Sequence, residues 1–251
     1  MIGDQAKDEV VRRSLVFGRR QGHKLRPKRQ ALVRKMLPEI KIDLEESGDV
    51  IDPHRYFGSG IDEIWLEIGF GAGEHLAWQA ARRPDVGFIG CEPFMNGVAA
   101  LLSRIVDGNL TNIRIFPDDA RLLLARLGVG QVSRLAMLFP DPWPKKRHHK
   151  RRIVNPEIIA RSADILATGG EFRFATDHTE LARWTMMHMH QERRFNWLAE
   201  HSLDWRERPE DWPETRYEQK AREAGRAAIF LRYLRRPQAA AETAHRARSA
   251  R

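Results

Sequence analysis

Residues 64–74 read Ile-Trp-Leu-Glu-Ile-Gly-Phe-Gly-Ala-Gly-Glu, and this segment carries the clearest indication of the fold class. Its apolar beginning, residues 64–68, is short and ends at glycines, a pattern that predicts a buried strand. The glycines allow backbone conformations and a close ligand approach that side chains would block. Residues 74–83 then predict a helix, which Pro84 stops. The stretch therefore predicts a strand, a ligand-binding turn and a helix in direct succession.

Strands and helices continue to alternate after this unit. Further strands are expected at residues 87–91, 113–116, 134–139, 171–175 and 227–234, and further helices at residues 94–106, 120–127, 155–167 and 179–191. This alternation predicts an α/β fold with a doubly wound, mostly parallel sheet. Sheets of this kind bind ligands at the carboxyl ends of their strands, so the site is expected there.

The glycine-rich turn favours a cofactor without phosphates. The dinucleotide fingerprint has glycine at its first, third and sixth places, and this chain has Glu74 at the sixth. A carboxylate there would repel a pyrophosphate, which disfavours NAD. S-adenosylmethionine has no phosphate, and its amino group and sulfonium are positive. Glu67, at the end of the first strand, could hold that amino group directly or through water.

Acidic residues also follow the second and third expected strands. Glu92 can accept hydrogen bonds from both ribose hydroxyls, a role that NAD enzymes share. Asp118 and Asp119 end the third strand, where an acid can accept a hydrogen bond from an adenine amino group. Each acid alone is also typical of a loop or a helix N-cap. Together with the glycine turn, the acids indicate a site for S-adenosylmethionine.

A proline-rich turn follows the fourth expected strand. Residues 139–144 read Phe-Pro-Asp-Pro-Trp-Pro, and the prolines on both sides of Asp141 stiffen the turn. Such a turn can present Asp141 and Trp143 rigidly to a base beside the cofactor. For Trp143, stacking on the base and packing in the core both remain open.

Positive charge is concentrated in two segments of a chain whose net charge is +9. Residues 1–30 contain nine Lys or Arg and three acids, and residues 145–152 contain six Lys or Arg. Clusters of this kind indicate a phosphate-rich partner, and we expect RNA. A solvated surface is the alternative for either run alone.

Four motifs occur in the order found in one enzyme family. They are the turn at residues 67–73, Pro-Asp-Pro-Trp at 140–143 with the basic run behind it, Ala-Thr-Asp at 175–177, and Thr-Arg-Tyr-Glu at 215–218. Over about residues 12–235 the chain resembles a bacterial tRNA (guanine-N7)-methyltransferase. The resemblance implies a Rossmann-like class I methyltransferase with a seven-stranded sheet. It also implies methyl transfer from S-adenosylmethionine to guanine N7 in tRNA, in the variable loop.

The resemblance also implies roles for individual residues. Cofactor contacts are expected from Glu67, Gly69, Gly71, Gly73, Glu92, Asp119 and Asp141, with Asp141 also catalytic. Substrate contacts are expected from Lys145, Asp177, Thr215, Arg216, Tyr217 and Glu218. RNA contacts are expected from Arg147, His148, His149, Lys150, Arg151 and Arg152. The family more often has Lys-Phe where this chain has Arg216-Tyr217, so the role of Arg216 is less firmly implied than that of Asp177. It often has His where this chain has Pro144, a change that only stiffens the turn.

The chemistry of the implied reaction limits what these residues do. Guanine N7 carries a lone pair and no proton, so methyl transfer is a direct in-line displacement that needs no general base. The ring gains positive charge as the sulfonium loses it. Positioning and nearby negative charge can lower this barrier. We therefore expect Asp141 and Asp177 to orient the guanine and the methyl donor, and Asp141 to stabilise the developing charge.

Composition sets the remaining expectations. Residues 1–30 predict a flexible basic arm, residues 31–236 a single methyltransferase domain, and residues 237–251 a frayed tail. The single cysteine, Cys91, the lack of a signal peptide and the lack of a long apolar run predict a cytoplasmic protein without a membrane span. No metal site is expected, because His188 and His190 would point to different faces of a helix. Monomer and homodimer both remain open.

Three other functions fit parts of the sequence. A methyltransferase for a small molecule would leave both basic clusters without a role. A non-catalytic RNA-binding protein would leave the intact glycine turn and its acids without a role. An NAD-dependent oxidoreductase is opposed by Glu74 and by the lack of an evident group of residues for hydride transfer.

Overall fold

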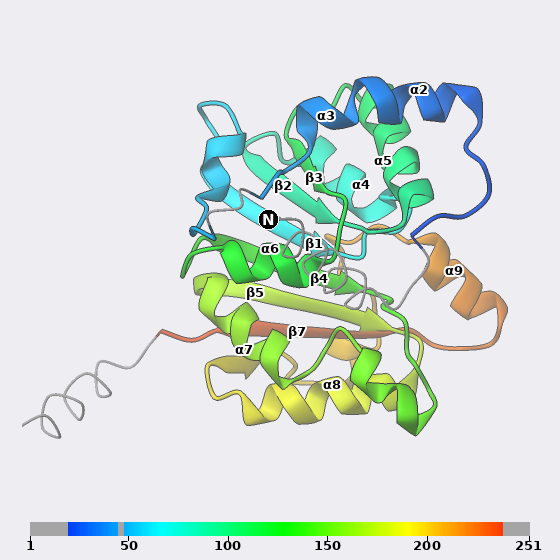
Figure 1. Ribbon diagram of the computed structural model, residues 1–251. Helices are drawn as coiled ribbons and strands as arrows, with labels where there is room; N and C mark the ends of the chain where they lie inside the picture. The colour runs from blue at the N-terminus through cyan, green and yellow to red at the C-terminus, as the bar shows by residue number, and fades with distance from the viewer. Residues whose placement is uncertain (1–19, 45–47, 238–251) are drawn as a thin grey trace, which may run out of the picture.

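The computed structural model describes residues 20–44 and 48–237 (Figure 1). Most of the expected basic arm, residues 1–19, and the expected tail from residue 238 onward lie outside this range. The described chain forms a seven-stranded sheet in the order β3-β2-β1-β4-β5-β7-β6. The strands are β1 Glu63–Ile68, β2 Val86–Cys91, β3 Ile113–Phe116, β4 Val132–Leu138, β5 Leu166–Thr176, β6 Phe195–Trp197 and β7 Ile229–Arg235.

Five strands of the sheet run in one direction. Strands β1 to β5 pair in parallel, β7 is antiparallel to β5, and β6 is antiparallel to β7. Because connections between parallel strands must cross back over the sheet, helices cover both of its faces. The prediction of a doubly wound, mostly parallel sheet of seven strands is confirmed.

The helices divide between the two faces (Figure 1). One face is covered by α4 Glu74–Arg82 and α5 Met95–Asp107, with α2 Pro27–Lys35 and α3 Leu37–Ile40 packed beside them. The other face is covered by α6 Ala120–Arg126, α7 Pro156–Ile165 and α8 Thr179–Gln191. The shorter elements are η1 Pro53–Tyr56, η2 Lys146–Arg151, η3 Ser202–Trp205 and α9 Arg216–Glu223.

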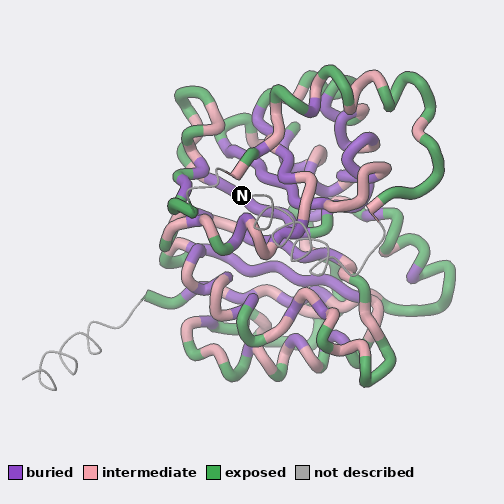
Figure 2. The backbone as a smooth tube through the Cα atoms, in the orientation of Figure 1, coloured by how far each residue is buried: buried purple, intermediate pink, exposed green. Residues whose placement is uncertain are grey.

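Alternate side chains of β1 contribute to the two hydrophobic cores, one on each face of the sheet. Ile64, Leu66 and Ile68 join the core under α6 and α7, and Trp65 joins the core under α4 and α5. Successive side chains of a strand point to opposite faces, so Glu67 lies on the same face as Trp65, beneath α4. β2 is buried along its whole length and β1 from Ile64 onward, and Figure 2 shows the central strands mostly in purple.

Five elements differ from the sequence-based expectations, namely α2, α7, β5, β6 and α9. α7 ends at Ile165 and β5 begins at Leu166, because the register shift between Val132 and Arg134 extends pairing to the start of β5. β6 and α9 were not predicted, since three residues and a strongly polar helix carry weak apolar patterns. Residues 27–30, placed in the basic arm, form the start of α2. In the described part of the chain, no helix combines the length and apolar character that a bilayer crossing requires.

Candidate active site

The glycine-rich turn between β1 and α4 is closely packed. Gly71 has a φ of 58°, in the left-handed region that favours glycine. A Cβ atom added at Gly97, in α5, would lie 2.2 Å from the carbonyl oxygen of Gly71. α5 therefore approaches the turn so closely that only glycine fits at position 97. Gly69 and Gly73 also have positive φ angles, so all three predicted glycines shape one turn.

Glu92, directly after β2, holds this turn in place by accepting hydrogen bonds from the backbone. Its Oε2 accepts a hydrogen bond from the Gly71 amide at 2.8 Å, and its Oε1 accepts one from the Phe94 amide at 3.0 Å. Burial raises the pKa of Glu92, and the nearby charge of Asp141 raises it further, while both backbone hydrogen bonds and Arg216 act in the opposite direction. The structure thus brings Asp141 and Arg216, from two distant motifs, into electrostatic range of Glu92.

Glu67 is buried at the end of β1 and has a histidine partner. Its Oε2 lies 2.7 Å from Nδ1 of His75, and Nε2 of His75 lies 3.2 Å from Nε2 of Gln79. The same Gln79 nitrogen donates to the carbonyl oxygen of Asp211 at 2.7 Å. Sequence reasoning missed His75 and Gln79. Their spacing of four on the predicted helix at 74–83 was the available signal, since it places them on one face.

Asp119, after β3, is the N-cap of α6. Its Oδ1 accepts a hydrogen bond from the Arg121 amide at 2.9 Å, and its Oδ2 pairs with the Arg121 guanidinium at 2.6 Å. The neighbouring Asp118 pairs with Arg20 at 2.7 Å. The first described residues of the basic arm therefore pass along the same sheet edge as the predicted adenine-binding acids.

The turn after β4 has a strained backbone. Phe139 and Trp143 have φ angles of 50° and 42°, which non-glycine residues rarely adopt. The Phe139 amide donates to the Ala175 carbonyl at 2.7 Å, so the turn stays in register with β5. Asp141 lies exposed between these two positions. Strained residues persist only where surrounding contacts hold them, and they cluster at functional sites.

The basic run forms η2, and most of its cations are exposed. Lys145, Lys146, Arg147 and Lys150 lie at the surface, and Arg151 lies 5.0 Å from the ring centre of Trp143. Partial desolvation and the neighbouring Arg151 and Arg147 lower the pKa of His148. His149 lies against Trp184, with ring centres 5.4 Å apart.

Arg152 differs from the other residues expected to contact RNA. It is 1% exposed, and its guanidinium donates to the Pro142 carbonyl at 2.9 Å and to Glu180. A side chain buried beneath the turn cannot reach a phosphate at the surface, so the expectation of direct RNA contact is corrected for Arg152. The side chain holds the proline-rich turn in place.

The Thr-Arg-Tyr-Glu motif begins α9 and lies over the glycine-rich turn. Thr215 caps the helix, accepting a hydrogen bond from the Glu218 amide at 3.3 Å. Arg216 pairs with Glu74 at 3.9 Å. The Tyr217 ring lies against Gly71, where an added Cβ atom would be 3.1 Å from it, and is nearly parallel to the Phe139 ring, with centres 6.5 Å apart.

The remaining predicted substrate residues are paired with arginines. Asp177, just after β5, pairs with Arg226 at 2.7 Å, and Glu218 pairs with Arg208 at 3.4 Å. Burial raises the pKa of Glu218, and Arg208 opposes that rise. Both acids are therefore anchored to the segment that leads into or out of α9.

The side chains at this edge fit S-adenosylmethionine. Glu67, Glu92 and Asp119 lie in or after the last residues of the neighbouring strands β1, β2 and β3. Each offers carboxylate oxygens that only accept hydrogen bonds when ionised. Acceptors suit an ammonium group, ribose hydroxyls and an adenine amino group, and they do not suit a pyrophosphate. Across residues 20–44 and 48–237, no three His, Cys, Asp or Glu side chains are grouped so that they could hold a metal ion.

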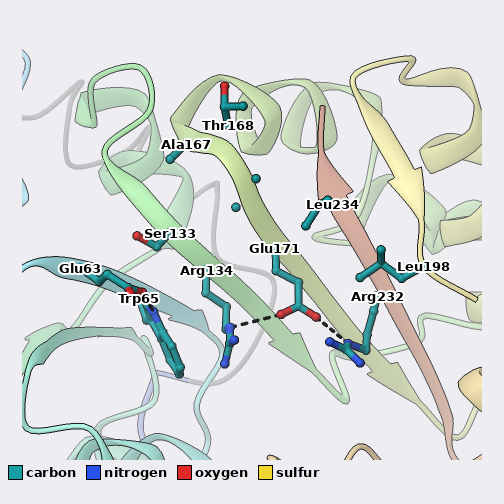
Figure 3. A pocket seen from close by; sticks show the side chains of 12 residues that line it. Glu63, Trp65, Ser133, Arg134, Ala167, Thr168, Glu171, Leu198, Arg232 and Leu234 are labelled. Atoms are coloured by element: carbon teal, nitrogen blue, oxygen red, sulfur yellow. Dashed lines mark hydrogen bonds and ion pairs between the residues drawn. The ribbon is translucent and has the colours of Figure 1, made fainter. Parts of the chain in front are cut away.

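A cavity of about 410 Å³ lies at the opposite end of the sheet (Figure 3). It is lined by the first residues of β1, β4 and β5, with Glu171 between Arg134 and Arg232. Burial alone would raise the pKa of Glu171, but Arg173, Arg232 and Arg134 lower it overall. Glu171 pairs with both Arg134 and Arg232, and none of the motif residues lines the cavity, so we place the functional site at the carboxyl edge.

Comparisons with known proteins identify the family of the chain. A family model described as "Putative methyltransferase" matches residues 62–231. A tRNA (guanine-N(7)-)-methyltransferase of Rhodospirillum rubrum is 48% identical over 226 residues, which cover 89% of each chain. One of Zymomonas mobilis is 49% identical over 220 residues, covering 88% of this chain and 94% of the relative.

A solved structure shows a similar fold. It is described as an antibiotic related methyltransferase, has a TM-score of 0.51 at 16% identity, and covers 80% of this chain and 99% of that chain. At this identity the likeness concerns the fold alone. It confirms the expectation of a Rossmann-like methyltransferase fold.

Proposed function

The chain belongs to the tRNA (guanine-N7-)-methyltransferase family, and from this premise we propose that it methylates N7 of a guanine in tRNA, using S-adenosylmethionine. The observation that carries the proposal is the contact of Tyr217 with Gly71. It joins the motif expected to bind the target base to the turn expected to bind the cofactor. The family resemblance supports a target guanine in the variable loop.

Three strand ends would hold the cofactor. Glu67 would bind its ammonium group, Glu92 its ribose hydroxyls and Asp119 its adenine amino group, as the chemistry of these acceptors favours. When bound, S-adenosylmethionine supplies an electrophilic methyl group on a positive sulfonium. An added Cβ atom at Gly69 would have no neighbour within 4 Å, so the cofactor can approach the backbone there, whereas Gly71 and Gly73 face Tyr217 and Leu101.

Asp141 and Asp177 would serve the target base. Guanine N7 attacks through a lone pair and has no proton to lose, so neither carboxylate needs to act as a base. Both can orient the guanine, and Asp141 can stabilise the positive charge that grows on the ring during transfer. The strained turn supports this role, because it holds Asp141 in a fixed position near Glu92.

The exposed face of η2 would bind the RNA backbone. Lys145, Arg147 and Lys150 project positive charge beside the turn that carries Asp141. A target base must leave its stack to reach a pocket of this kind. Trp143, half-buried and flanked by Arg151, is placed to stack on that base or on a neighbour.

The test is methyl transfer from labelled S-adenosylmethionine to unmodified tRNA, followed by chemical cleavage at N7-methylguanine. We expect label in the variable loop for the wild type and a loss of roughly 100-fold in rate for Asp141→Ala, the scale of removing one preorganised electrostatic contact. Asp62→Ala is the matched control, because Asp62 is exposed just before β1, at the other end of the sheet.

Each other outcome would change the proposal. Label at a different base would retain the methyltransferase and reject the N7 target. Bound cofactor without any label would favour a small-molecule substrate or a non-catalytic RNA-binding protein. Equal rates for Asp141→Ala and Asp62→Ala would remove the catalytic role of Asp141.

A further inference from the structure

A buried chain of hydrogen bonds begins at the carboxylate proposed for the cofactor. It runs from Glu67 to His75 to Gln79 and ends on the backbone carbonyl of Asp211. The three side chains are 5%, 6% and 4% exposed. Burying polar groups to this degree costs free energy unless each of them has a hydrogen-bond partner. The hydrogen bonds of this network therefore favour a single arrangement of the three side chains.

The partners fix where the protons lie. The Asp211 carbonyl only accepts, so the Gln79 atom 2.7 Å from it is the amide nitrogen, which only donates. That nitrogen has two hydrogens and no acceptor site, so Nε2 of His75, 3.2 Å away, must accept the second one. The Glu67 carboxylate accepts from the other ring nitrogen, Nδ1. His75 is thus held as the neutral ring with its hydrogen on Nδ1.

A neutral donor suits a carboxylate that must attract a cation. A protonated imidazole 2.7 Å from Glu67 would cancel much of the carboxylate's charge in a buried setting. The neutral ring orients the carboxylate through one hydrogen bond and leaves its charge in place. Resting on the proposed role of Glu67, we propose that His75, locked by Gln79, is the positioning residue that holds Glu67 for the ammonium group of S-adenosylmethionine.

The hydrogen-bond network ends at Asp211, in the segment that leads to the Thr-Arg-Tyr-Glu motif. The Trp212 ring contacts the edge of the His75 ring, with centres 5.9 Å apart, and Asp211 is also paired with Arg173 at 2.6 Å. Thr215 begins α9 three positions after Trp212. The segment at Asp211 and Trp212 therefore contacts the residues that hold Glu67 and also leads directly into the Thr-Arg-Tyr-Glu motif.

Two substitutions of His75 test the roles of its two ring nitrogens separately. In His75→Asn the amide nitrogen can replace Nδ1 as a donor to Glu67, whereas in His75→Gln the amide reaches toward Gln79 and leaves Glu67 without its donor. We expect the dissociation constant for S-adenosylmethionine to stay within about 3-fold of wild type in H75N and to rise roughly 10-fold or more in H75Q. Calorimetry on the full chain, with thermal melts to show that both variants are folded, measures this.

A truncated ligand gives a readout that general structural damage would not produce. Methylthioadenosine has the adenosine part of the cofactor but no ammonium group, so H75Q and Glu67→Gln should leave its affinity unchanged. If H75Q weakens both ligands equally, His75 supports the fold and positions nothing, which overturns the inference.

A double-mutant cycle tests whether His75 acts through Glu67. If it does, H75Q should have no further effect on cofactor affinity in the E67Q background. An undiminished effect in that background would overturn the inference and leave the proposed function intact. If E67Q itself binds S-adenosylmethionine as tightly as wild type, the proposed role of Glu67 fails first.

Discussion

Arg152 and Glu180 are joined across the base of the proline-rich turn, and the Arg152 side chain is completely buried there. The same guanidinium also donates to the Pro142 and Trp143 carbonyls, on either side of the strained position at Trp143. The Arg152 hydrogen bond lowers the pKa of Glu180. The last cation of the basic run therefore fixes the turn that carries Asp141.

Removing Arg152 should damage the fold and the reaction, not RNA binding alone. Arg152→Ala leaves two backbone carbonyls without their donor, which we expect to lower the free energy of unfolding by about 1–3 kcal/mol. The rate of methyl transfer should fall with it, because Asp141 loses its support. Denaturant unfolding and single-turnover rates measure both effects.

The matched control for that variant is Arg147→Ala, five positions earlier in the same run. Arg147 is exposed, so its loss should leave stability unchanged and weaken tRNA binding. If the two variants were equally stable, the assigned role of Arg152 would be wrong.

Gly97 should not tolerate even a methyl group. Helix propensity alone would favour Gly97→Ala by about 1 kcal/mol, but the new Cβ atom would lie 2.2 Å from the Gly71 carbonyl oxygen. We expect the turn to be displaced, with a net loss of roughly 1–3 kcal/mol in stability and a marked loss of cofactor affinity. Gly58→Ala is the control, since an added Cβ atom there has no neighbour within 4 Å. Cofactor binding as tight in G97A as in G58A would contradict the packing argument.

Cofactor affinity should decline on mild acidification because of Glu92. Burial raises its pKa, so the folded protein protonates Glu92 at a higher pH than an ordinary glutamate. For stability, a raised pKa means that the favourable contribution is present below the unfolded pKa and is lost as pH rises through the folded one. For binding the sign is opposite, since ribose hydroxyls need the carboxylate.

Calorimetry between pH 8 and pH 5 should therefore show S-adenosylmethionine affinity falling before the ordinary pKa of glutamate is reached. In Glu92→Ala this step should be missing from whatever binding remains. A wild-type affinity that holds constant down to the ordinary glutamate range would refute the prediction.

Binding of tRNA should depend steeply on salt. Each phosphate neutralised by the exposed basic run releases counterions, which gives a slope of log affinity against log salt of about −0.7 per phosphate for single strands and nearer −0.9 for duplex. Replacing Arg147 and Lys150 together with Ala should make the slope shallower by roughly 1–2. Filter-binding or fluorescence titrations over a series of salt concentrations measure it, and a slope unchanged by the double substitution would place the RNA on another surface.

The features of this protein that depend on local patterns follow from its amino-acid sequence. The apolar run at residues 64–68, the glycines behind it and the helix at residues 74–83 predicted the first unit of the sheet, because strand burial, glycine conformations and proline stops act over a few residues. The acids at strand ends could be placed at one edge for the same reason, since parallel strands align their carboxyl ends.

The contacts between these residues, in contrast, follow from how distant segments pack together. Arg152 has the same local surroundings as its cationic neighbours, and its burial follows from Glu180, 28 positions away. Gln79 meets the Asp211 carbonyl across 132 positions, and Tyr217 meets Gly71 only after α9 folds back over the turn. Such contacts form when distant segments pack together. A buried polar group costs free energy unless it has a hydrogen-bond partner, and this cost favours the packing that supplies the partner. A local sequence pattern does not show which distant residue that partner is.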